Sequence, residues 1–368
     1  MSWTAQQSAA IQKVVHWARD RKAPQVMRLF GYAGTGKTTL AKEVAREVPG
    51  TLFAAYTGKA ALVLRGKGCT GASTIHSLIY KAQQDQMTGE YEYSLNPDSA
   101  AAYAPLIAID ECSMVGEEIG RDLLSYGTKV LVLGDPAQLP PVGGEGFFTA
   151  APPDIMLTDI HRQAADSPII RLSMDVREGR TLVAGTYGDC VVQQRTSITK
   201  ERMRELVLEA DQLLCGRNAT RQTFNGRVRA LKGVDQPMPV KGDKLVCLRN
   251  NRMKGLLNGG LWTVNGASTG HDGVFMTVQS QDDPDQPHPI EVQTPAEFFL
   301  GTEKSLPWMQ RKRADEFTYG YALTVHKSQG SSWPNVLLFD ESSVFREDAA
   351  RHLYTGITRA AEKLTIII

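Results

Sequence analysis

The stretch GYAGTGKT, residues 31–38, decides the fold class, because it matches the phosphate-binding pattern GxxxxGK[ST]. An apolar run at residues 26–30 precedes it, and residues 37–47 have helical spacing, so the loop joins a strand to a helix. Glycines in such a loop let backbone N–H groups turn toward phosphate oxygens, and the helix start adds positive potential. The sequence therefore predicts an α/β domain with a nucleotide site at the end of a parallel sheet.

This loop supplies the first candidate residues for nucleotide and metal binding. Lys37 is placed to reach the β- and γ-phosphates, and the Thr38 hydroxyl is placed to hold Mg²⁺. The residues expected to contact the nucleotide here are Gly34, Thr35, Gly36, Lys37, Thr38 and Thr39.

A second motif, LIAIDECSMV at residues 106–115, supplies two carboxylates. Four mostly apolar residues form a strand that delivers Asp110 and Glu111 at its carboxyl end, where open parallel sheets carry their ligands. Asp110 suits Mg²⁺, and Glu111 is placed to orient or deprotonate an attacking water. The two motifs predict a nucleoside triphosphatase, and at this point a kinase, a GTPase and a motor all remain open. The Asn-Lys-x-Asp motif with which GTPases of the usual kind read the base does not occur.

Length and composition limit the remaining possibilities. A chain of 368 residues predicts two or three domains, and its longest apolar runs are too short to span a membrane. Five dispersed cysteines without a CxxC pair predict reduced, mostly buried thiols and no zinc site. A net charge of +1 neither supports nor excludes nucleic acid as a partner, since a groove can be basic inside a neutral molecule.

Strand and helix signals alternate in two series along the chain. The first series adds strands at residues 51–56, 106–109 and 130–133, and the second includes a helix at 168–178, a strand at 212–215 and a helix at 219–231. At the C-terminal end, LYTGITRAAEKLTIII predicts a helix at residues 354–360 and a strand at 364–368.

Two segments interrupt this alternation. Residues 81–104 are polar, contain two turn signals and alternate at Glu90-Tyr91-Glu92-Tyr93, which predicts an inserted hairpin. Residues 234–314 are rich in glycine with short strand-like pieces, which predicts a small inserted β-barrel. The expected domains are therefore residues 1–152, and residues 153–233 together with 315–368.

The remaining motifs form an ordered series over nearly the whole chain. On these motifs the sequence resembles superfamily 1B DNA helicases of the RecD-like and Dda-like branch. Trp3 stands where the branch usually has leucine, and the chain is short for the branch. The stretches that carry the resemblance are WTAQQ (3–7), TGKAA (57–61), STIH (73–76), DECSMV (110–115), GDPAQLPPV (134–142), DIHRQ (159–163), ALTVHKSQGSSWPNV (322–336) and LYTGITRA (353–360).

The resemblance implies a fold of two RecA-like parallel-sheet domains, 1A and 2A. The hairpin insert corresponds to domain 1B, the strand-separating pin, and the barrel insert corresponds to the SH3-like domain 2B. Within this fold Gln7 is expected to read the adenine of ATP, and Gln138 to contact the γ-phosphate or the attacking water. Arg162 and Arg359 are expected to reach the transferring phosphoryl group from the second domain, where a cation lowers the barrier. Gly330 is expected to link nucleotide and DNA.

The resemblance also implies single-stranded DNA and DNA forks as partners, gripped through phosphates rather than read through bases. His76 and His326 are equally compatible with packing, and Tyr91 and Tyr93 with packing on the hairpin stem. Asn218, Arg221 and Asn225 are expected to hold loops near DNA or nucleotide, and the basic run 311–313 fits DNA or a solvated linker. The expected DNA contacts are Thr57, Lys59, Ser73, Thr74, His76, Tyr91, Tyr93, Thr324, His326 and Lys327.

The function that the resemblance implies is an ATP-dependent DNA helicase that moves 5′ to 3′ with ATP and Mg²⁺ as cofactors. ATP would close the cleft between the two domains, and hydrolysis would open it. Two alternatives remain: a motor subunit that unwinds only within a larger complex, and a nucleotide-gated DNA-binding module. RNA as the track is less favoured. We expect a monomer in the cytoplasm of a bacterial or phage-infected cell, away from membranes, with replication or recombination proteins as further partners.

Overall fold

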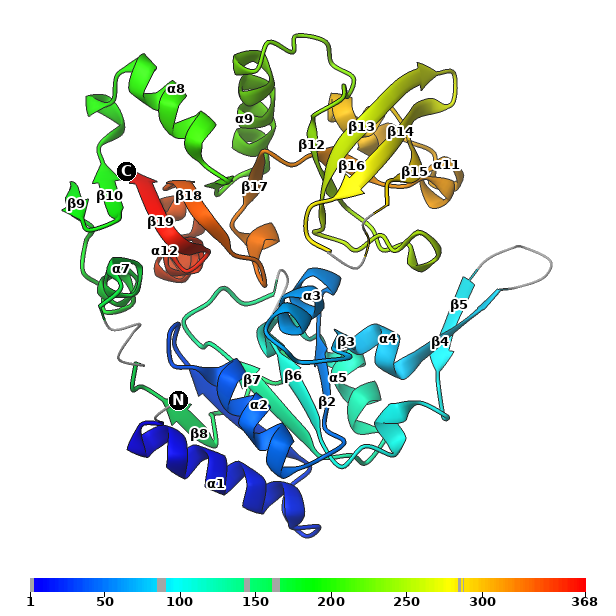
Figure 1. Cartoon of the computed structure of the whole chain (residues 1–368), viewed down its shortest axis with the longest axis vertical. Coiled ribbons are helices and arrows are strands. Elements are labelled where there is room, and N and C mark those ends of the chain that lie inside the picture. The colour runs from blue at the N-terminus through cyan, green and yellow to red at the C-terminus, as the bar shows by residue number, and fades with distance from the viewer. Residues whose placement is uncertain (1–2, 85–90, 142–145, 161–165, 284–285, 287) are drawn as a thin grey trace. The chain divides into compact units, whose positions relative to one another are not determined.

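The structure is a computed structural model that describes residues 3–84, 91–141, 146–160, 166–283, 286 and 288–368. The chain divides into two compact units, Met1–Ile170 and Arg171–Ile368 (Figure 1). Helix α7 (Pro168–Arg177) begins just before the boundary between them.

The first unit contains a six-stranded sheet in which every neighbouring pair is parallel. The predicted strands at 26–30, 51–56, 106–109 and 130–133 all form, with bounds that differ by one or two residues. In spatial order the strands are β3 (Ser73–Thr74), β2 (Leu52–Ala55), β6 (Ile107–Asp110), β7 (Val130–Gly134), β1 (Val26–Gly31) and β8 (Ile155–Leu157).

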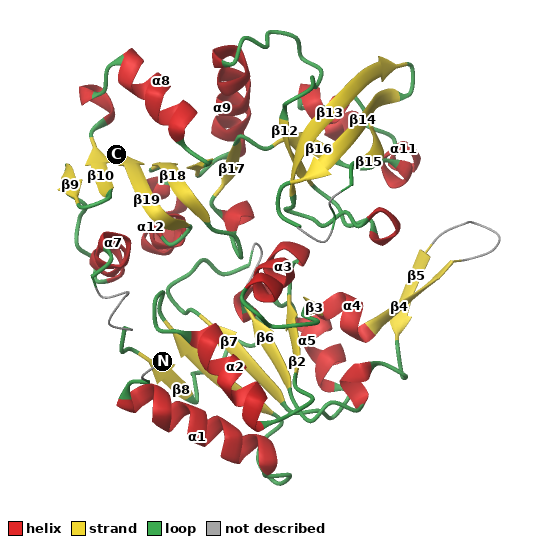
Figure 2. Cartoon of the chain, in the orientation of Figure 1, coloured by secondary structure: helices red, strands yellow, loops and turns green. Residues whose placement is uncertain are grey.

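Helices cover both faces of this sheet, because successive side chains of a buried strand point to opposite faces. Leu29 and Leu131 pack in one hydrophobic cluster with α1 (Ala5–Arg19), α2 (Lys37–Glu47) and α3 (Gly58–Gly66). Their neighbours Phe30 and Val130 pack in a second cluster with α4 (Ile75–Ile79) and α5 (Glu117–Leu124). Figure 2 shows α2 in front of the strands and α1 below them in the view. The predicted α/β class with a RecA-like parallel sheet is confirmed.

The strand β8 lies just after the expected domain boundary between residues 152 and 153 but belongs to the first sheet. Leu29 of β1 pairs with Ile155 of β8, so this strand completes the first sheet. The side chain of Asp154 accepts a 2.7 Å hydrogen bond from Arg28 N, which fixes the entry into β8. A three-residue strand has too short a pattern to be assigned from the sequence, and the first sheet extends beyond the expected boundary.

A two-stranded hairpin, β4 (Tyr80–Gln84) and β5 (Tyr91–Leu95), extends from the first unit within the segment where a hairpin was predicted. The Tyr126 hydroxyl anchors its base, because it lies 2.8 Å from Ile79 O and 2.7 Å from Asn96 O, and the two carbonyls share its single hydrogen. The turn between the two strands lies outside the described residues.

The second unit contains a six-stranded sheet that is parallel except for its last pair, β10 with β9. Helices α7, α8 (Lys200–Glu209), α9 (Asn218–Leu231) and α12 (Ala349–Ile357) belong to this part. In spatial order its strands are β17 (Ala322–Thr324), β11 (Gln212–Cys215), β18 (Trp333–Phe339), β19 (Ala360–Ile367), β10 (Cys190–Gln193) and β9 (Gly185–Tyr187).

The C-terminal prediction was partly wrong. The expected helix at 354–360 instead ends at Ile357, and the expected strand at 364–368 begins at Ala360. The strand start was missed because Glu362 and Lys363 are polar and this end of β19 is exposed. Lys363 nevertheless pairs with Asn335 of β18. Arg359 therefore lies in the short turn between α12 and β19.

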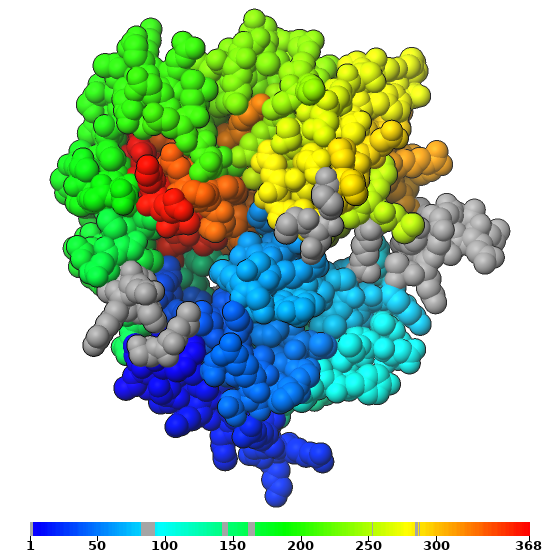
Figure 3. Space-filling model, viewed as in Figure 1, coloured from blue at the N-terminus to red at the C-terminus, as the bar shows by residue number. Residues whose placement is uncertain are grey.

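An antiparallel five-stranded sheet forms a separate lobe of the second unit, yellow and orange in Figure 3. It includes β16, which lies beyond the expected end of the insert at residue 314, because β16 pairs with β12. The likeness of this sheet to an SH3 barrel stays a prediction. The strands in spatial order are β15 (Ile290–Thr294), β14 (Gly273–Ser280), β13 (Leu261–Gly270), β12 (Lys244–Cys247) and β16 (Phe317–Tyr319), with the helices α10 (Glu297–Leu300) and α11 (Trp308–Arg313) between β15 and β16.

A buried ion pair ties α9 to this five-stranded sheet. Arg229 of α9 is 4% exposed, and its Nη2 lies 3.1 Å from Asp243 Oδ2. Tyr321 donates to Asp243 at 3.0 Å, and the Arg229 guanidinium lies 4.2 Å from the Tyr319 ring centroid. Because removing one partner would leave a buried charge unpaired, this network fixes the helix against the sheet.

All five cysteines are described, buried and free, as predicted. Among the described residues, every helix is too short or too polar to cross a membrane.

Candidate nucleotide-binding and nucleic-acid-binding sites

The phosphate loop between β1 and α2 has the backbone conformation that its glycines predict. Gly34 and Gly36 both have φ of 79°, in the left-handed region that side chains disfavour. Gly36 is the N-cap residue of α2, and the Thr35 hydroxyl donates to Tyr32 O at 2.9 Å. Lys37, Thr38 and Thr39 therefore form the first turn of α2, where free N–H groups favour an anion.

Lys37 lies folded onto its own loop. Its ammonium group donates to Gly31 O at 2.6 Å and to Tyr32 O at 3.1 Å. These carbonyls hold the Lys37 ammonium group beside the loop glycines. Rotation of the Lys37 side chain lets this group exchange the carbonyl oxygens for phosphate oxygens.

Thr38 and Asp110 come together from separate elements. Thr38 at the start of α2 donates its hydroxyl to Asp110 Oδ2 at 2.9 Å, and Asp110 ends β6. The other carboxylate oxygen accepts from Glu111 N at 2.9 Å. A hydroxyl and one carboxylate fit Mg²⁺, which is usually held through one or two carboxylates together with substrate phosphates. The described residues contain no cluster of three or more His, Cys, Asp or Glu that could hold a metal.

Glu111 has an unusual backbone conformation directly after this site. Its φ of 52° and ψ of 46° lie in the left-handed region, where it caps the short helix η2 (Cys112–Met114). A non-glycine residue in this region costs about 1–3 kcal/mol, and such residues concentrate at functional sites. Asp110 fixes this geometry through the bond to Glu111 N.

Gln138 lies in the loop after β7 with an unsatisfied side chain. It is 9% exposed, and its Oε1 is buried without a hydrogen-bond partner among the described residues. Its backbone N–H donates to Asp135 O at 3.2 Å, within a turn. Leaving a buried acceptor unpaired costs about 1–3 kcal/mol, so this oxygen is ready to accept from a water or a ligand.

Both polar atoms of the Gln7 side chain are hydrogen-bonded within the protein. It is 1% exposed, its Oε1 accepts from Thr4 N at 3.0 Å, and its Nε2 donates to Thr35 O at 3.0 Å. Thr4 and Gln7 form the capping box of α1. In this structure Gln7 therefore fastens α1 to the phosphate loop, and its expected contact with adenine stays a prediction.

Arg359 is held within the second unit. It is 5% exposed, and its guanidinium donates to Thr355 O, Ser331 O and Thr358 Oγ1, at 3.0, 3.1 and 3.1 Å. Ser331 directly follows Gly330, so these bonds connect the end of α12 to the loop that carries Gly330. A guanidinium has five N–H donors, and the described residues use three of them.

His326 and His352 form an aromatic cluster with Phe345. Phe345 lies in η7 (Ser342–Asp348) and stacks on His352 of α12, with ring centroids 4.1 Å apart, while His326 lies 5.3 Å from Phe345. His352 is 1% exposed, and its Nε2 has no partner among the described residues. Burial, together with the neighbouring His326, lowers the pKa of His352 from 6.5 to about 4. His326 thus packs against aromatic rings in this structure, and its expected contact with DNA stays a prediction.

We expect this buried imidazole to make stability depend on pH. Since the pKa is lower in the folded state, the unfolded chain binds the proton first, and the stabilisation present above pH 6.5 is lost as pH falls toward 4. Between pH 6.5 and 5 the loss from this group is roughly 2 kcal/mol. Urea unfolding of the wild type and of His352→Phe at both pH values measures it. The variant is expected to lose less stability on acidification, and equal losses would contradict the assignment.

The hydroxyls expected to contact DNA on the first unit cap helices. Thr57 Oγ1 accepts from Ala60 N at 3.2 Å as the N-cap of α3, and Thr74 Oγ1 accepts from Ser77 N at 3.0 Å as the N-cap of α4. Ser73 precedes Thr74 in the edge strand β3, and Lys59 is 8% exposed in the first turn of α3. Thr57 and Lys59 follow β2, and Ser73 and Thr74 form β3, which pairs with β2, so all four residues lie near the carboxyl ends of two neighbouring strands.

The His76 ring packs against aromatic side chains of the two hairpin strands. Its ring centroid is 4.7 Å from that of Tyr80 and 4.8 Å from that of Tyr93. Tyr93 remains 53% exposed, so this contact leaves much of its ring open, and both alternatives for it remain. The side chain of Tyr91 and the whole of Arg162 lie outside the described residues.

Lys327 and Thr324 lie together on the second unit, where Thr324 Oγ1 accepts from Lys327 N at 3.3 Å.

One important residue was missed by the sequence analysis. Glu341 accepts from Gly216 N at 2.9 Å and from Arg217 N at 3.0 Å, and so caps the start of α9. It follows β18 as the acidic pair follows β6, and that position after a buried strand could have revealed it.

Comparison with known proteins assigns the chain to a family. Residues 2–190 match a family model described as an AAA domain, and residues 319–367 match one described as a UvrD-like helicase C-terminal domain. The first match covers more than half of the chain. The chain belongs to this AAA-domain family, and the predicted resemblance to RecD-like helicases is confirmed by a RecD2 helicase among its relatives.

Individual relatives agree with this assignment. The ATP-dependent RecD2 DNA helicase of Deinococcus radiodurans is 30% identical over 372 residues, covering 91% of this chain and 46% of that protein. The chain thus spans less than half the length of this relative. A structure titled for DNA unwinding at forked double-stranded DNA by two Pif1 helicases matches with a TM-score of 0.60, at 18% identity over 100% of this chain and 92% of the other. The Bacteroides Pif1 helicase in complex with ADP-AlF3 and single-stranded DNA gives 0.59, with the same identity and coverages.

Proposed function

We propose that the chain is an ATP-dependent DNA helicase that moves 5′ to 3′ along single-stranded DNA and unwinds duplex. The observation that carries the proposal is the 2.9 Å bond between Thr38 and Asp110, which joins the phosphate loop to the acidic strand end. This pairing, followed by Glu111, is what ATP hydrolysis requires. The substrate class comes from the relatives, since one is named an ATP-dependent DNA helicase and others carry single-stranded or forked DNA.

Hydrolysis is assigned to side chains of the first unit. Lys37 and the loop N–H groups bind the β- and γ-phosphates, and Thr38 and Asp110 would hold Mg²⁺. When bound, the ion neutralises charge on the β- and γ-phosphate oxygens. Glu111 orients the attacking water and accepts its proton, while the free Oε1 of Gln138 accepts a hydrogen bond from the same water.

Two arginines complete the proposed chemistry. Arg359 and Arg162 stabilise the charge that develops on the transferring phosphoryl group. Support for Arg359 comes from its two unused donors and from its bond to Ser331, which ties it to the Gly330 loop.

Movement requires a grip on the strand. We assign this grip to Thr57, Lys59, Ser73, Thr74 and His76 on the first unit, and to Thr324, His326 and Lys327 on the second. Hydroxyls and cations hold phosphates without selecting sequence. Tyr91 and Tyr93 on the hairpin, the proposed 1B pin, are assigned to the fork, and the five-stranded sheet is assigned as domain 2B.

The direction of movement is tested with forked and tailed duplexes. We expect the chain to unwind a duplex that carries only a 5′ single-stranded tail, in an ATP-dependent reaction, and to leave a duplex with only a 3′ tail intact. Strand release is followed by gel electrophoresis or by fluorescence of a labelled strand. Unwinding from the 3′ tail alone would overturn the polarity.

A further inference from the structure

The loop at residues 325–331 is attached to α12 at both of its ends. At its C-terminal end, Ser331 O accepts at 3.1 Å from Arg359, which lies in the turn after α12. At its N-terminal end, Val325 packs against α12 at Gly356, because a Cβ atom on Gly356 would lie only 3.3 Å from Val325 Cγ2. The missing side chain of Gly356 lets the helix and the loop approach so closely. The loop and α12 therefore form one packed body within the second unit.

Two stacked rings form a third attachment between this loop and α12. The loop contains the short helix η6 (His326–Ser328), and the His326 ring centroid lies 5.3 Å from that of Phe345 in η7. Phe345 stacks on His352 of α12, with 4.1 Å between ring centroids and 14° between ring planes. His352 precedes Arg359 by seven positions, or about two helical turns. The rings thus hold the beginning of α12, whereas Arg359 holds its end.

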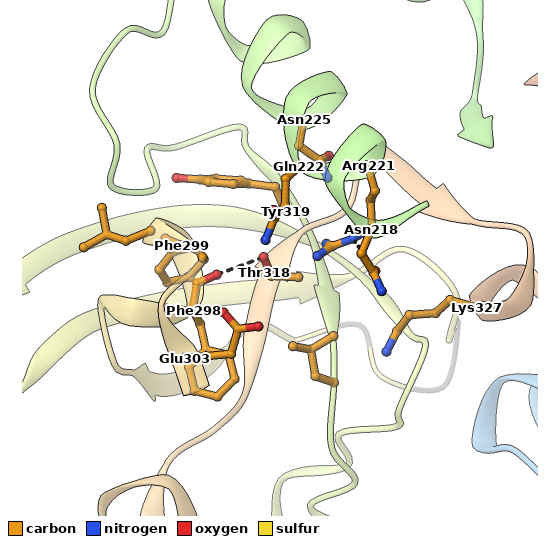
Figure 4. Close-up of a pocket in the computed structure, with 13 residues that line it drawn as sticks. Asn218, Arg221, Gln222, Asn225, Phe298, Phe299, Glu303, Thr318, Tyr319 and Lys327 are labelled. Carbon is orange, nitrogen blue, oxygen red and sulfur yellow. Dashed lines mark hydrogen bonds between the residues drawn. The ribbon is translucent and has the colours of Figure 1, made fainter. Parts of the chain in front are cut away.

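The same loop carries a residue of the proposed strand grip. Lys327 belongs to η6, and Figure 4 shows its side chain beside Asn218 and Arg221, at the start of α9, in a pocket of about 300 Å³. The start of α9 also approaches η7, because a Cβ atom on Gly216 would lie 3.0 Å from Phe345 Cε2. Phe345 therefore packs against both elements that border this pocket, η6 and the start of α9.

The connection η7 is fixed to α9 and is strained. Before it, Glu341 accepts hydrogen bonds from Gly216 N and Arg217 N at the start of α9. Within it, Arg346 has φ of 49° and ψ of −111°, a conformation that residues with a side chain rarely adopt. Such strain persists only where the surroundings hold the backbone, and it concentrates at ligand clamps and switch segments. The ring stack of Phe345, directly before Arg346, is one contact that holds it.

We propose that Phe345 and His352 are positioning residues that couple strand binding at η6 to hydrolysis by Arg359. A strand phosphate held by Lys327 displaces η6 and the start of α9, and both of these elements contact Phe345. Because packed side chains transmit displacements, the stack carries this shift to His352 and along α12. Each ring acts only through Arg359 and touches neither nucleotide nor strand. The inference rests on the proposed function, which assigns Lys327 to the strand and Arg359 to the phosphoryl group.

The test replaces Phe345 with leucine, which keeps an apolar side chain but removes the stack. ATP turnover is measured without a strand and over a series of oligothymidylate concentrations. We expect the ratio of strand-saturated to strand-free turnover to fall by about fivefold or more, the usual size of a coupling between two sites. The oligothymidylate concentration at half-maximal stimulation should change less than about twofold, because Phe345 does not contact the strand.

Three further variants separate positioning from loss of structure. Phe224→Leu breaks a comparable ring pair, Phe224 with Phe339 at 4.3 Å, which includes neither η6 nor α12, and should keep the wild-type ratio. His352→Leu is expected to lower the ratio as Phe345→Leu does, whereas His352→Phe keeps two stacked aromatic rings and should retain it. Thermal unfolding verifies that each variant is folded. A role in stability alone would lower the unfolding temperature without changing the ratio.

Three results would contradict the proposal. If the wild type is stimulated and Phe345→Leu shares the ratio of Phe224→Leu, the stack does not couple the sites, although the helicase assignment stands. If Phe345→Leu raises the half-stimulating strand concentration and keeps the saturated ratio, the rings belong to strand binding instead. If the strand leaves wild-type turnover unchanged, the proposed function and the coupling fail together.

Discussion

Replacing Lys37 with alanine is expected to reduce ATP turnover by at least about 10³-fold and to abolish unwinding. Lys37 is the one side chain of the loop that brings full positive charge to the β- and γ-phosphates, and its ammonium group is bonded, within the described part of the chain, to the carbonyls of Gly31 and Tyr32. Alanine keeps the helix start, because it has the highest helix propensity. Steady-state phosphate release and strand separation on a 5′-tailed fork measure the two losses.

The matched control for this variant is Arg46→Ala. Arg46 lies on the same helix, with a side chain that is 73% exposed and paired with Glu43 at 2.7 Å. An exposed pair of this kind contributes little to stability, so the control should retain wild-type turnover. Turnover in Lys37→Ala within tenfold of the control would contradict the nucleotide site.

Replacing Arg359 with alanine is expected to lower kcat by roughly 10³- to 10⁵-fold, the range for a cation that stabilises a transferring phosphoryl group. If the arginine acts mainly in the transition state, nucleotide affinity should change far less than kcat. Turnover and nucleotide binding are therefore measured on the same variant, the latter by titration of a fluorescent ATP analogue.

A structural role for Arg359 must be separated from this chemical role. Its side chain bonds to Thr355 O and Ser331 O, so alanine leaves two carbonyls without this donor and is expected to lower the unfolding temperature. Arg351→Ala is the matched control on α12, because Arg351 is half-exposed and pairs only with Asp348 among the described residues. If folded Arg359→Ala keeps kcat within threefold of this control, Arg359 has no part in hydrolysis.

The sequence predicted the nucleotide loop and the acidic strand end well, because both signals are local. Gly34 and Gly36 are required by backbone conformation, and Asp110 and Glu111 follow an unbroken apolar strand. The Thr38–Asp110 bond could be expected once both elements were assigned to one parallel sheet. The alternation of strand and helix signals along the chain likewise predicted a parallel sheet, although it could not set the strand ends.

Features that depend on distant partners escaped prediction. Gln7 has the same sequence context whether it reads a base or bonds Thr35 O, and only the position of α1 beside the loop decides. The start of β19 at Ala360 depends on pairing with Trp333, and no local pattern shows that pairing.

The most direct test of the account is the ATP turnover of the wild-type chain with and without single-stranded DNA. An enzyme that couples hydrolysis to movement on a strand must respond to that strand. The proposed grip residues Thr324, His326 and Lys327 and the Gly330 loop share one unit with Arg359. We expect Mg²⁺-dependent turnover that rises when an oligothymidylate is added and saturates with its concentration. Turnover that is undetectable, or that is the same with and without the strand, would contradict the assignment as a DNA-dependent motor.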